Sequence, residues 1–141
     1  MIQFILMKMN DMIVFEIDPS PAPRMVKSDV WRKRPVVLRY FAYRDNLRLL
    51  AKLHKYILTE AVSIVFFIPM PVSWSEKKKR DMNGKPHQSR PDIDNLCKAF
   101  LDCLEDEDSY VWRIEAEKRW AYIGSIQVKN PRSLSSDSGV H

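Results

Sequence analysis

The spacing of apolar and polar positions predicts alternating strands and helices along most of the chain. Residues 12–17 (MIVFEI) and 61–68 (AVSIVFFI) are rich in β-branched and aromatic side chains, a composition typical of strands. Between them, apolar positions recur at helical spacing from Leu38 to about Tyr56. This period predicts an amphipathic helix.

The second half of the chain repeats this alternation. An apolar stripe at positions 93, 96, 97, 100 and 104 predicts a helix from Ile93 to Leu104, after a long polar loop over residues 72–89. Residues 110–120 alternate apolar and charged side chains, which indicates a half-buried strand. Residues 124–129 predict a final strand, and pairing with the preceding strand in a hairpin is one open arrangement. The order predicts an α+β fold, a small mixed β-sheet with two main helices on one face.

Length and composition predict one folded domain in the cytoplasm. A chain of 141 residues has room for a single core, which we assign to residues 12–130. Residues 1–11 are interpreted as an N-terminal extension, and residues 131–141 as a disordered tail with little apolar content. The longest apolar run, residues 64–70, is too short to span a membrane, and the start lacks the order of a secretion signal. Cys97 and Cys103 are expected to be thiols, and their spacing matches no zinc motif.

Charge is distributed unevenly along this basic chain, whose formal net charge is +5. Residues 77–90 contain one acid, Asp81, and six basic residues, namely Lys77, Lys78, Lys79, Arg80, Lys85 and Arg90. Such a segment suits phosphate binding, and the aromatic ring of Trp74 just before it could stack on bases. The alternative is a solvated charged loop with Trp74 folded back on the core.

Acidic residues at the start of the second helix suggest a metal site. Asp92 and Asp94 stand there, and Lys98 lies four residues beyond Asp94 on the same helix face. If the acids at 106–108 return beside this point, three carboxylates converge next to a lysine, a site suited to Mg²⁺ or Mn²⁺. The same residues also suit a structural role, with Asp92 as a helix cap and Asp94 paired with Lys98. His87 is interpreted as a phosphate contact, a base or an ordinary loop residue.

Four segments together resemble the RusA family of endodeoxyribonucleases, which resolve Holliday junctions and are common in bacteriophages and prophages. They are PMPVSWSEKKKR (69–80), KPH (85–87), RPDIDNLCKAFLD (90–102) and EDSYV (107–111). The resemblance extends over about residues 12–128, and its specific part is residues 69–112.

The resemblance implies a RusA-like homodimer that nicks two opposed strands of a four-way DNA junction. It implies dependence on Mg²⁺, for which Mn²⁺ can substitute, and no small-molecule cofactor. The metal-binding acids of the family correspond to Asp92, Asp94 and Asp108, the essential lysine corresponds to Lys98, and Asn95 has a supporting role. The connection after the helix is shorter here than in better known members, so Asp106 and Glu107 are alternative third ligands.

We therefore expect a junction-specific endonuclease in DNA recombination and repair. Water activated by metal ions at Asp92, Asp94 and Asp108 would attack the scissile phosphate. Lys98 would offset charge on the phosphate or orient the nucleophile. The DNA-binding residues would be Trp74, Lys77, Lys78, Lys79, Arg80, Lys85 and Arg90. Two alternatives stay open: a catalytically inactive module that binds branched DNA, and a flap or fork nuclease of the same fold.

Overall fold

The computed structural model describes residues 12–23, 34–105 and 110–129. Its elements are β1 (Met12–Phe15), α2 (Pro35–Leu53), β2 (Ala61–Pro69), α3 (Glu76–Met82), α4 (Ile93–Leu104), β3 (Arg113–Ala121) and β4 (Ser125–Lys129). The predicted N-terminal extension and C-terminal tail lie outside the described residues. No helix within the described ranges is long and apolar enough to cross a membrane.

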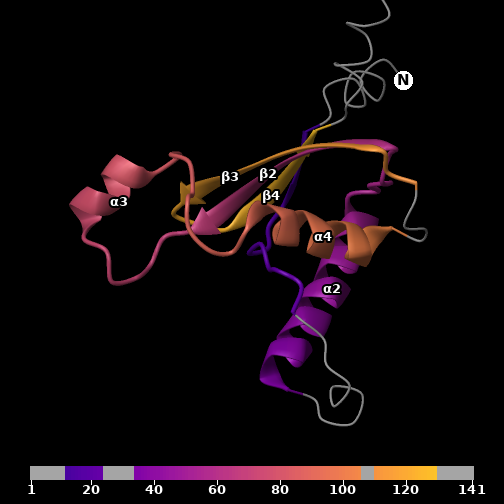
Figure 1. The fold of residues 1–141 in the computed structure, drawn as a ribbon, viewed down its shortest axis with the longest axis horizontal. Helices are drawn as coiled ribbons and strands as arrows, with labels where there is room; N and C mark the ends of the chain where they lie inside the picture. Colours follow the sequence, from indigo (N-terminus) through magenta and orange to yellow (C-terminus); the bar gives the residue numbers. More distant parts are fainter. Residues whose placement is uncertain (1–11, 24–33, 106–109, 130–141) are drawn as a thin grey trace, which may run out of the picture.

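The four strands form one mixed sheet in the order β1-β4-β2-β3 (Figure 1). β2 pairs in parallel with β3 and antiparallel with β4, which in turn pairs antiparallel with β1. The mixed sheet predicted from the sequence is therefore confirmed. The hairpin between the last two strands is wrong, because β2 lies between β3 and β4.

β2 contributes the centre of the core through one of its faces. Val62, Ile64 and Phe66 are buried, while the residues between them are only half-buried. On the neighbouring strand β4, Ile126 and Val128 face the same side and are also buried. The sheet thus buries alternate residues on one face, as strands covered on one side do.

The two main helices, α2 and α4, cover this face of the sheet (Figure 1). Leu47 of α2 and Leu96 and Phe100 of α4 are fully buried in the same cluster as the strand residues. α4 has the predicted bounds, because its apolar stripe is the side that packs on the sheet. The α+β arrangement with two main helices on one face is confirmed.

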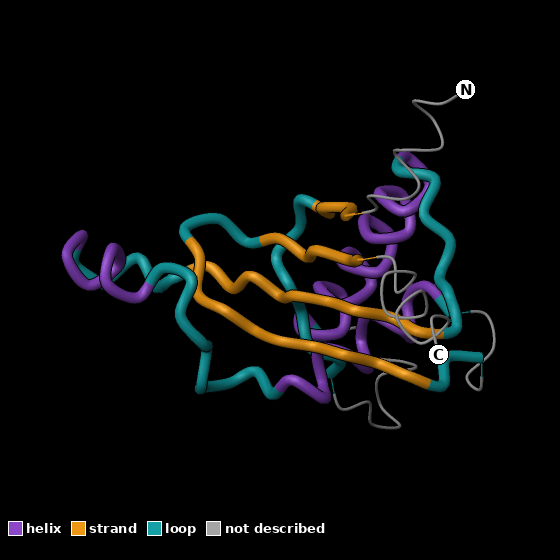
Figure 2. Tube along the Cα trace, turned by 90° about the horizontal axis from the view of Figure 1, so that it is seen from above, coloured by secondary structure: helices purple, strands orange, loops and turns teal. Residues whose placement is uncertain are grey.

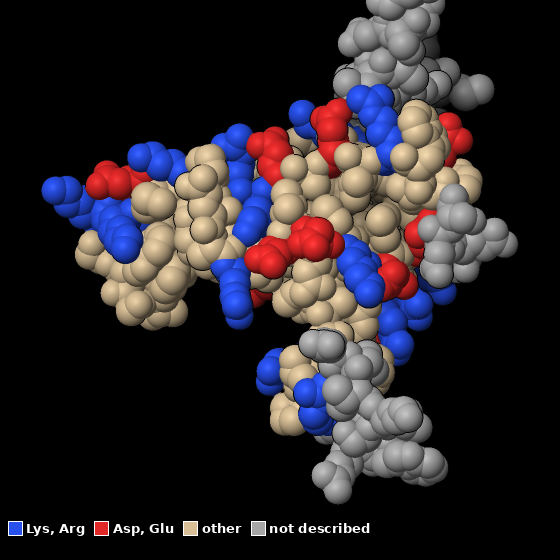
Figure 3. All heavy atoms as spheres, viewed as in Figure 1, with Lys and Arg blue, Asp and Glu red and all other residues tan. Residues whose placement is uncertain are grey.

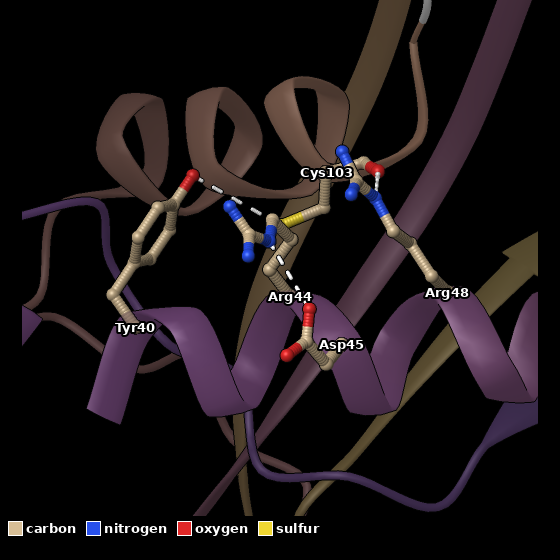
Figure 4. A network of polar contacts seen from close by, with 5 residues as sticks. All are labelled: Tyr40, Arg44, Asp45, Arg48 and Cys103. Atoms are coloured by element: carbon tan, nitrogen blue, oxygen red, sulfur yellow. Dashed lines mark hydrogen bonds and ion pairs between the residues drawn. The ribbon is translucent and has the colours of Figure 1, made fainter. Parts of the chain in front are cut away.

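Polar contacts join α2 to the last turn of α4 (Figure 4). Arg48 Nε donates a hydrogen bond to the carbonyl oxygen of Cys103 at 2.8 Å, and the Cys103 thiol lies 3.9 Å from Tyr40 Oη. Burial, with a smaller contribution from Cys103, raises the pKa of Tyr40 to about 12, so this phenol stays neutral. A second α2 arginine, Arg44, pairs with Asp45 at 3.2 Å.

α2 begins and ends earlier than the sequence pattern predicts. It starts at Pro35, because proline lacks a backbone donor and is well accommodated in the first turn of a helix. It ends at Leu53, where His54 takes the C-cap position and the next residue, Lys55, has a positive φ of 53°. The backbone there leaves the helical region.

α3 lies within the segment predicted to be a polar loop, so that prediction is wrong over residues 76–82. The Ser75 side chain caps the helix by accepting a hydrogen bond from the Lys78 backbone N–H at 3.2 Å, and Glu76 stands in the first turn. None of its residues is buried. Figure 2 shows α3 set apart beyond the ends of the strands.

Candidate active site and nucleic-acid surface

Asp92 and Asp94 lie at the start of α4 with their carboxylates exposed. Asp92 occupies the N-cap position, and its backbone carbonyl accepts the first helical hydrogen bond from Leu96 at 3.1 Å, but its side chain makes no capping hydrogen bond. Within the described residues, neither carboxylate takes part in a hydrogen bond or ion pair. Asp92 therefore holds the predicted N-cap position without a side-chain cap, and both carboxylates are available to a ligand.

Asp94 and Lys98 line one groove between α4 and β3, with a volume of about 560 Å³. Ile114 and Ala116 of β3 form the opposite side. The pairing of Asp94 with Lys98 considered from the sequence is not among the ion pairs of the described residues. Lys98 is exposed and lines the same groove as Asp94.

The third predicted acid, Asp108, lies outside the described residues, as do the alternatives Asp106 and Glu107. Glu105, the described acid that precedes them, accepts a hydrogen bond from the Val111 backbone N–H at 3.0 Å. It stands eleven residues after Asp94 along the helix, which is about 16 Å of rise. Glu105 and Asp102 line the same groove as Asp94, but the rise of the helix separates Glu105 from the acidic pair at the start of α4.

The donor set at the start of α4 suits a hard divalent cation. Mg²⁺ binds through oxygen ligands, commonly one or two carboxylates completed by water and substrate phosphates. Asp92 at the N-cap and Asp94 in the first turn, two residues further on, supply two unengaged carboxylates. The described residues contain no group of three or more potential metal ligands, so the substrate, water or an undescribed residue would complete the site.

Lys118 of β3 holds the segment that leads into Asp92. Its Nζ donates hydrogen bonds to the carbonyl oxygens of Ser89 at 2.6 Å and Pro91 at 2.8 Å. Its own carbonyl oxygen accepts a hydrogen bond from the His87 backbone N–H at 2.9 Å. The sequence pattern does not single out Lys118 as a functional residue. The available signal was a lysine between Ala116 and Trp120, on the apolar side of the alternating strand.

The predicted DNA-binding cations differ in their surroundings. Lys77, Arg80, Lys85 and Arg90 are exposed. Lys78 lies over the Trp74 ring with its Nζ 4.2 Å from the centroid, and the half-buried Lys79 is 4.0 Å from the Glu76 carboxylate. In Figure 3 basic side chains gather around α3 beside one acidic patch, whereas both acidic and basic side chains lie over α4. The exposed cations of α3 are the ones free to meet phosphate.

Trp74 and His87 both pack against the Trp120 ring in tilted arrangements, with interplanar angles of 54° and 51°. The Trp120 ring centroid lies 4.7 Å from that of Trp74 and 4.2 Å from that of His87. His87 is only 3% exposed, and its Nδ1 has no hydrogen-bond partner in the described structure. Burial, with a smaller effect of Lys118, lowers the pKa of His87, so the imidazole is neutral. These contacts favour anchoring roles over the predicted base-stacking role of Trp74 and phosphate or base role of His87.

The family model for "Endodeoxyribonuclease RusA" matches residues 16–129, which is most of the chain. Its match includes every described element except the first strand, and it spans the acidic start of α4 and the basic α3. These features belong to a nuclease with a positively charged surface. The chain is a member of the RusA endodeoxyribonuclease family. No curated protein matches the sequence.

Proposed function

We propose that this protein resolves Holliday junctions by divalent-metal-dependent cleavage of two opposed DNA strands, acting as a homodimer. The observation that carries the proposal is the pair of unengaged carboxylates of Asp92 and Asp94, in the family's motif and beside Lys98. Purely structural acids would be expected to make capping bonds or ion pairs.

The acidic residues and the lysine at the start of α4 would have different roles in cleavage. Asp92 and Asp94 would hold Mg²⁺ or Mn²⁺, with Asp108 as the proposed third ligand. The ion would supply Lewis-acid chemistry, which activates water and stabilises the leaving oxygen. Lys98 would place a positive charge against the scissile phosphate, because it lies in the groove with Asp94 and has no ion-pair partner among the described residues.

The exposed cations near α3 would bind the DNA backbone. Lys77 and Arg80 project from the helix, and Lys85 and Arg90 follow it on the way to Asp92. Contacts of this kind position the DNA without reading its sequence. The chain would therefore bind through α3 and its return segment, and cut at the start of α4.

Substitution of Asp92→Asn or Asp94→Asn tests the catalytic assignment. We expect junction cleavage in Mg²⁺ to fall by more than about a hundredfold, because loss of a ligand should exceed the effect of losing an outer-shell partner. Affinity for the junction in EDTA should be unchanged. Asp45→Asn is the matched control, since Asp45 is an exposed acid on α2. Robust cutting by both site variants would contradict the assignment.

A panel of labelled four-way junction, flap, fork and duplex substrates with Mn²⁺ separates the alternatives. The proposal expects paired cuts in the junction and little cutting of the duplex. Preferred cutting of flaps or forks would indicate a different nuclease of this fold. Tight junction binding without any cleavage by the wild-type chain would indicate an inactive DNA-binding module.

A further inference from the structure

Lys118 occupies a position of β3 where an apolar residue would be expected. It alternates with Ala116 and Trp120 on the side of the sheet that faces the helices, and it pairs in register with Phe66, which is fully buried. An ammonium group at such a site is costly unless its donors are hydrogen-bonded. The long stem can cross the apolar surface while the charged end reaches polar partners.

Those partners all belong to the short segment before Asp92. The ammonium contacts the carbonyl oxygens of Ser89 at 2.6 Å and Pro91 at 2.8 Å, which are charge-assisted hydrogen bonds. The Lys118 carbonyl oxygen binds the His87 N–H at 2.9 Å. One residue of the edge strand β3 thus fixes the backbone at three points within the five residues that precede Asp92.

The segment has little else to fix its backbone. Residues 88–91 belong to no helix or strand, and the described backbone hydrogen bonds outside regular elements include none from these four residues. A carboxylate at the end of such a segment would sample many positions if the segment were released. A metal site needs its ligands held in place before the ion arrives.

We propose that Lys118 is a positioning residue for the Asp92 and Asp94 carboxylates, and that its ammonium preorganises the proposed divalent-cation site through the Ser89 and Pro91 carbonyl groups. The inference rests on the proposed function but adds a residue outside the acidic motif. Lys118 acts through the backbone and touches neither the scissile phosphate nor the ion. Its loss should therefore weaken ion binding in the absence of DNA.

Direct Mn²⁺ binding by the DNA-free protein is the main test, measured from the electron paramagnetic resonance signal of free Mn²⁺. We expect Lys118→Met to raise the Mn²⁺ dissociation constant about tenfold or more, the range seen when outer-shell partners of metal ligands are removed. The half-saturating Mg²⁺ concentration for junction cleavage should rise by a similar factor. Junction affinity in EDTA should stay within about twofold, since phosphate contacts on α3 are intact.

Three further variants make the test decisive. Lys118→Arg keeps the charge and the donors and should restore most of the Mn²⁺ affinity, whereas a purely space-filling role predicts no such rescue. Lys118→Gln keeps a neutral donor and serves if Lys118→Met fails to fold in thermal melts. Lys129→Met is the matched control, because Lys129 is an exposed lysine at the end of β4, and it should behave as wild type.

The outcomes separate this inference from the proposed function. A folded Lys118→Met or Lys118→Gln variant with wild-type Mn²⁺ affinity overturns the positioning role, while wild-type cleavage leaves the proposed function intact. Loss of junction affinity in EDTA with unchanged Mn²⁺ binding overturns it in favour of a direct DNA contact. A wild-type chain that binds no Mn²⁺ and cuts no junction overturns the proposed function and this inference together.

Discussion

His87 shows at the scale of one residue how the fold changes a sequence-based hypothesis. A histidine in a basic loop suggests a phosphate contact or a base. The structure instead buries its ring against Trp120, while its backbone N–H binds the Lys118 carbonyl oxygen. A neutral imidazole in this position joins the return segment to β3, and Trp74 joins the start of α3 to the same Trp120 ring.

This burial predicts a specific dependence of stability on pH. Because the pKa of His87 is lower in the folded protein than the ordinary value of about 6.5, the unfolded chain binds the extra proton first. The free energy of unfolding should be constant above that pH and should fall as the pH drops below it. Urea unfolding between about pH 7.5 and pH 5.5 checks this, a range in which most carboxylates stay ionised.

Two histidine variants assign the effect. His87→Phe should fold, keep the ring contact with Trp120 and flatten the profile over this range. His54→Gln removes an exposed histidine at the C-cap position of α2 and should retain the wild-type slope. A steep profile in His87→Phe would show that other groups cause the dependence.

At the scale of elements, α4 could be predicted from the sequence and α3 could not. The stripe that includes Leu96 and Phe100 is apolar because it packs on the sheet, so burial and period coincide. α3 buries none of its residues, so no period marks it. The available signals were local ones, Ser75 as cap and Glu76 in the first turn. The acidic pair at the start of α4 was found from its spacing, whereas Lys118 was hidden because its role depends on a distant segment.

The arrangement of α3 predicts which cations determine the salt dependence of DNA binding. Lys78 is engaged with Trp74 and Lys79 with Glu76, which leaves Lys77 and Arg80 for phosphate. The double variant Lys77→Gln/Arg80→Gln should weaken junction binding. It should also lower the slope of log K against log salt by about 2 in magnitude, because each phosphate contact contributes about 0.9.

A matched pair of charges on another helix provides the control for this slope. Arg39→Gln/Lys52→Gln removes two exposed cations from α2 and the same net charge. Fluorescence anisotropy of a labelled junction at several salt concentrations compares the two. Equal slopes in both double variants would mean that net charge, and not the position of α3, determines binding.

At the scale of the whole molecule, the strand order depends on contacts that the sequence does not reveal. Only residues 122–124 connect β3 and β4, a length typical of hairpins. β2 is nevertheless inserted between them and pairs along both edges, and Met70 N–H binds the Ala121 carbonyl oxygen at 2.9 Å where the connection crosses its end. Gly124 ends this crossing where Asp18, just after β1, leaves no room for a Cβ atom.

The proposed homodimer is expected to make paired cuts, because a four-way junction presents two equivalent strands to a two-fold symmetric protein. A homodimer has twice the chain mass of 16.6 kDa, and sedimentation equilibrium should give that value. On a supercoiled plasmid with an extruded cruciform, the two acidic sites should cut within the lifetime of one complex and yield linear DNA. A monomer that still linearises the plasmid would contradict the paired mechanism.

Mixed dimers test the coupling of the two cuts directly. When equal amounts of wild-type and Asp92→Asn chains are refolded together, about half of the dimers contain one intact site. These dimers should bind the cruciform normally and convert the plasmid to nicked circles, because only one strand meets an intact carboxylate pair. The contrary result is a yield of linear plasmid proportional to the fraction of wild-type chains, with no nicked circles. It would mean either that the subunits do not exchange or that each site cuts independently of its partner. Different tags on the wild-type and Asp92→Asn chains allow the mixed dimer to be purified, which separates these two outcomes. An independent site in that dimer would cut both strands in sequence and yield linear plasmid.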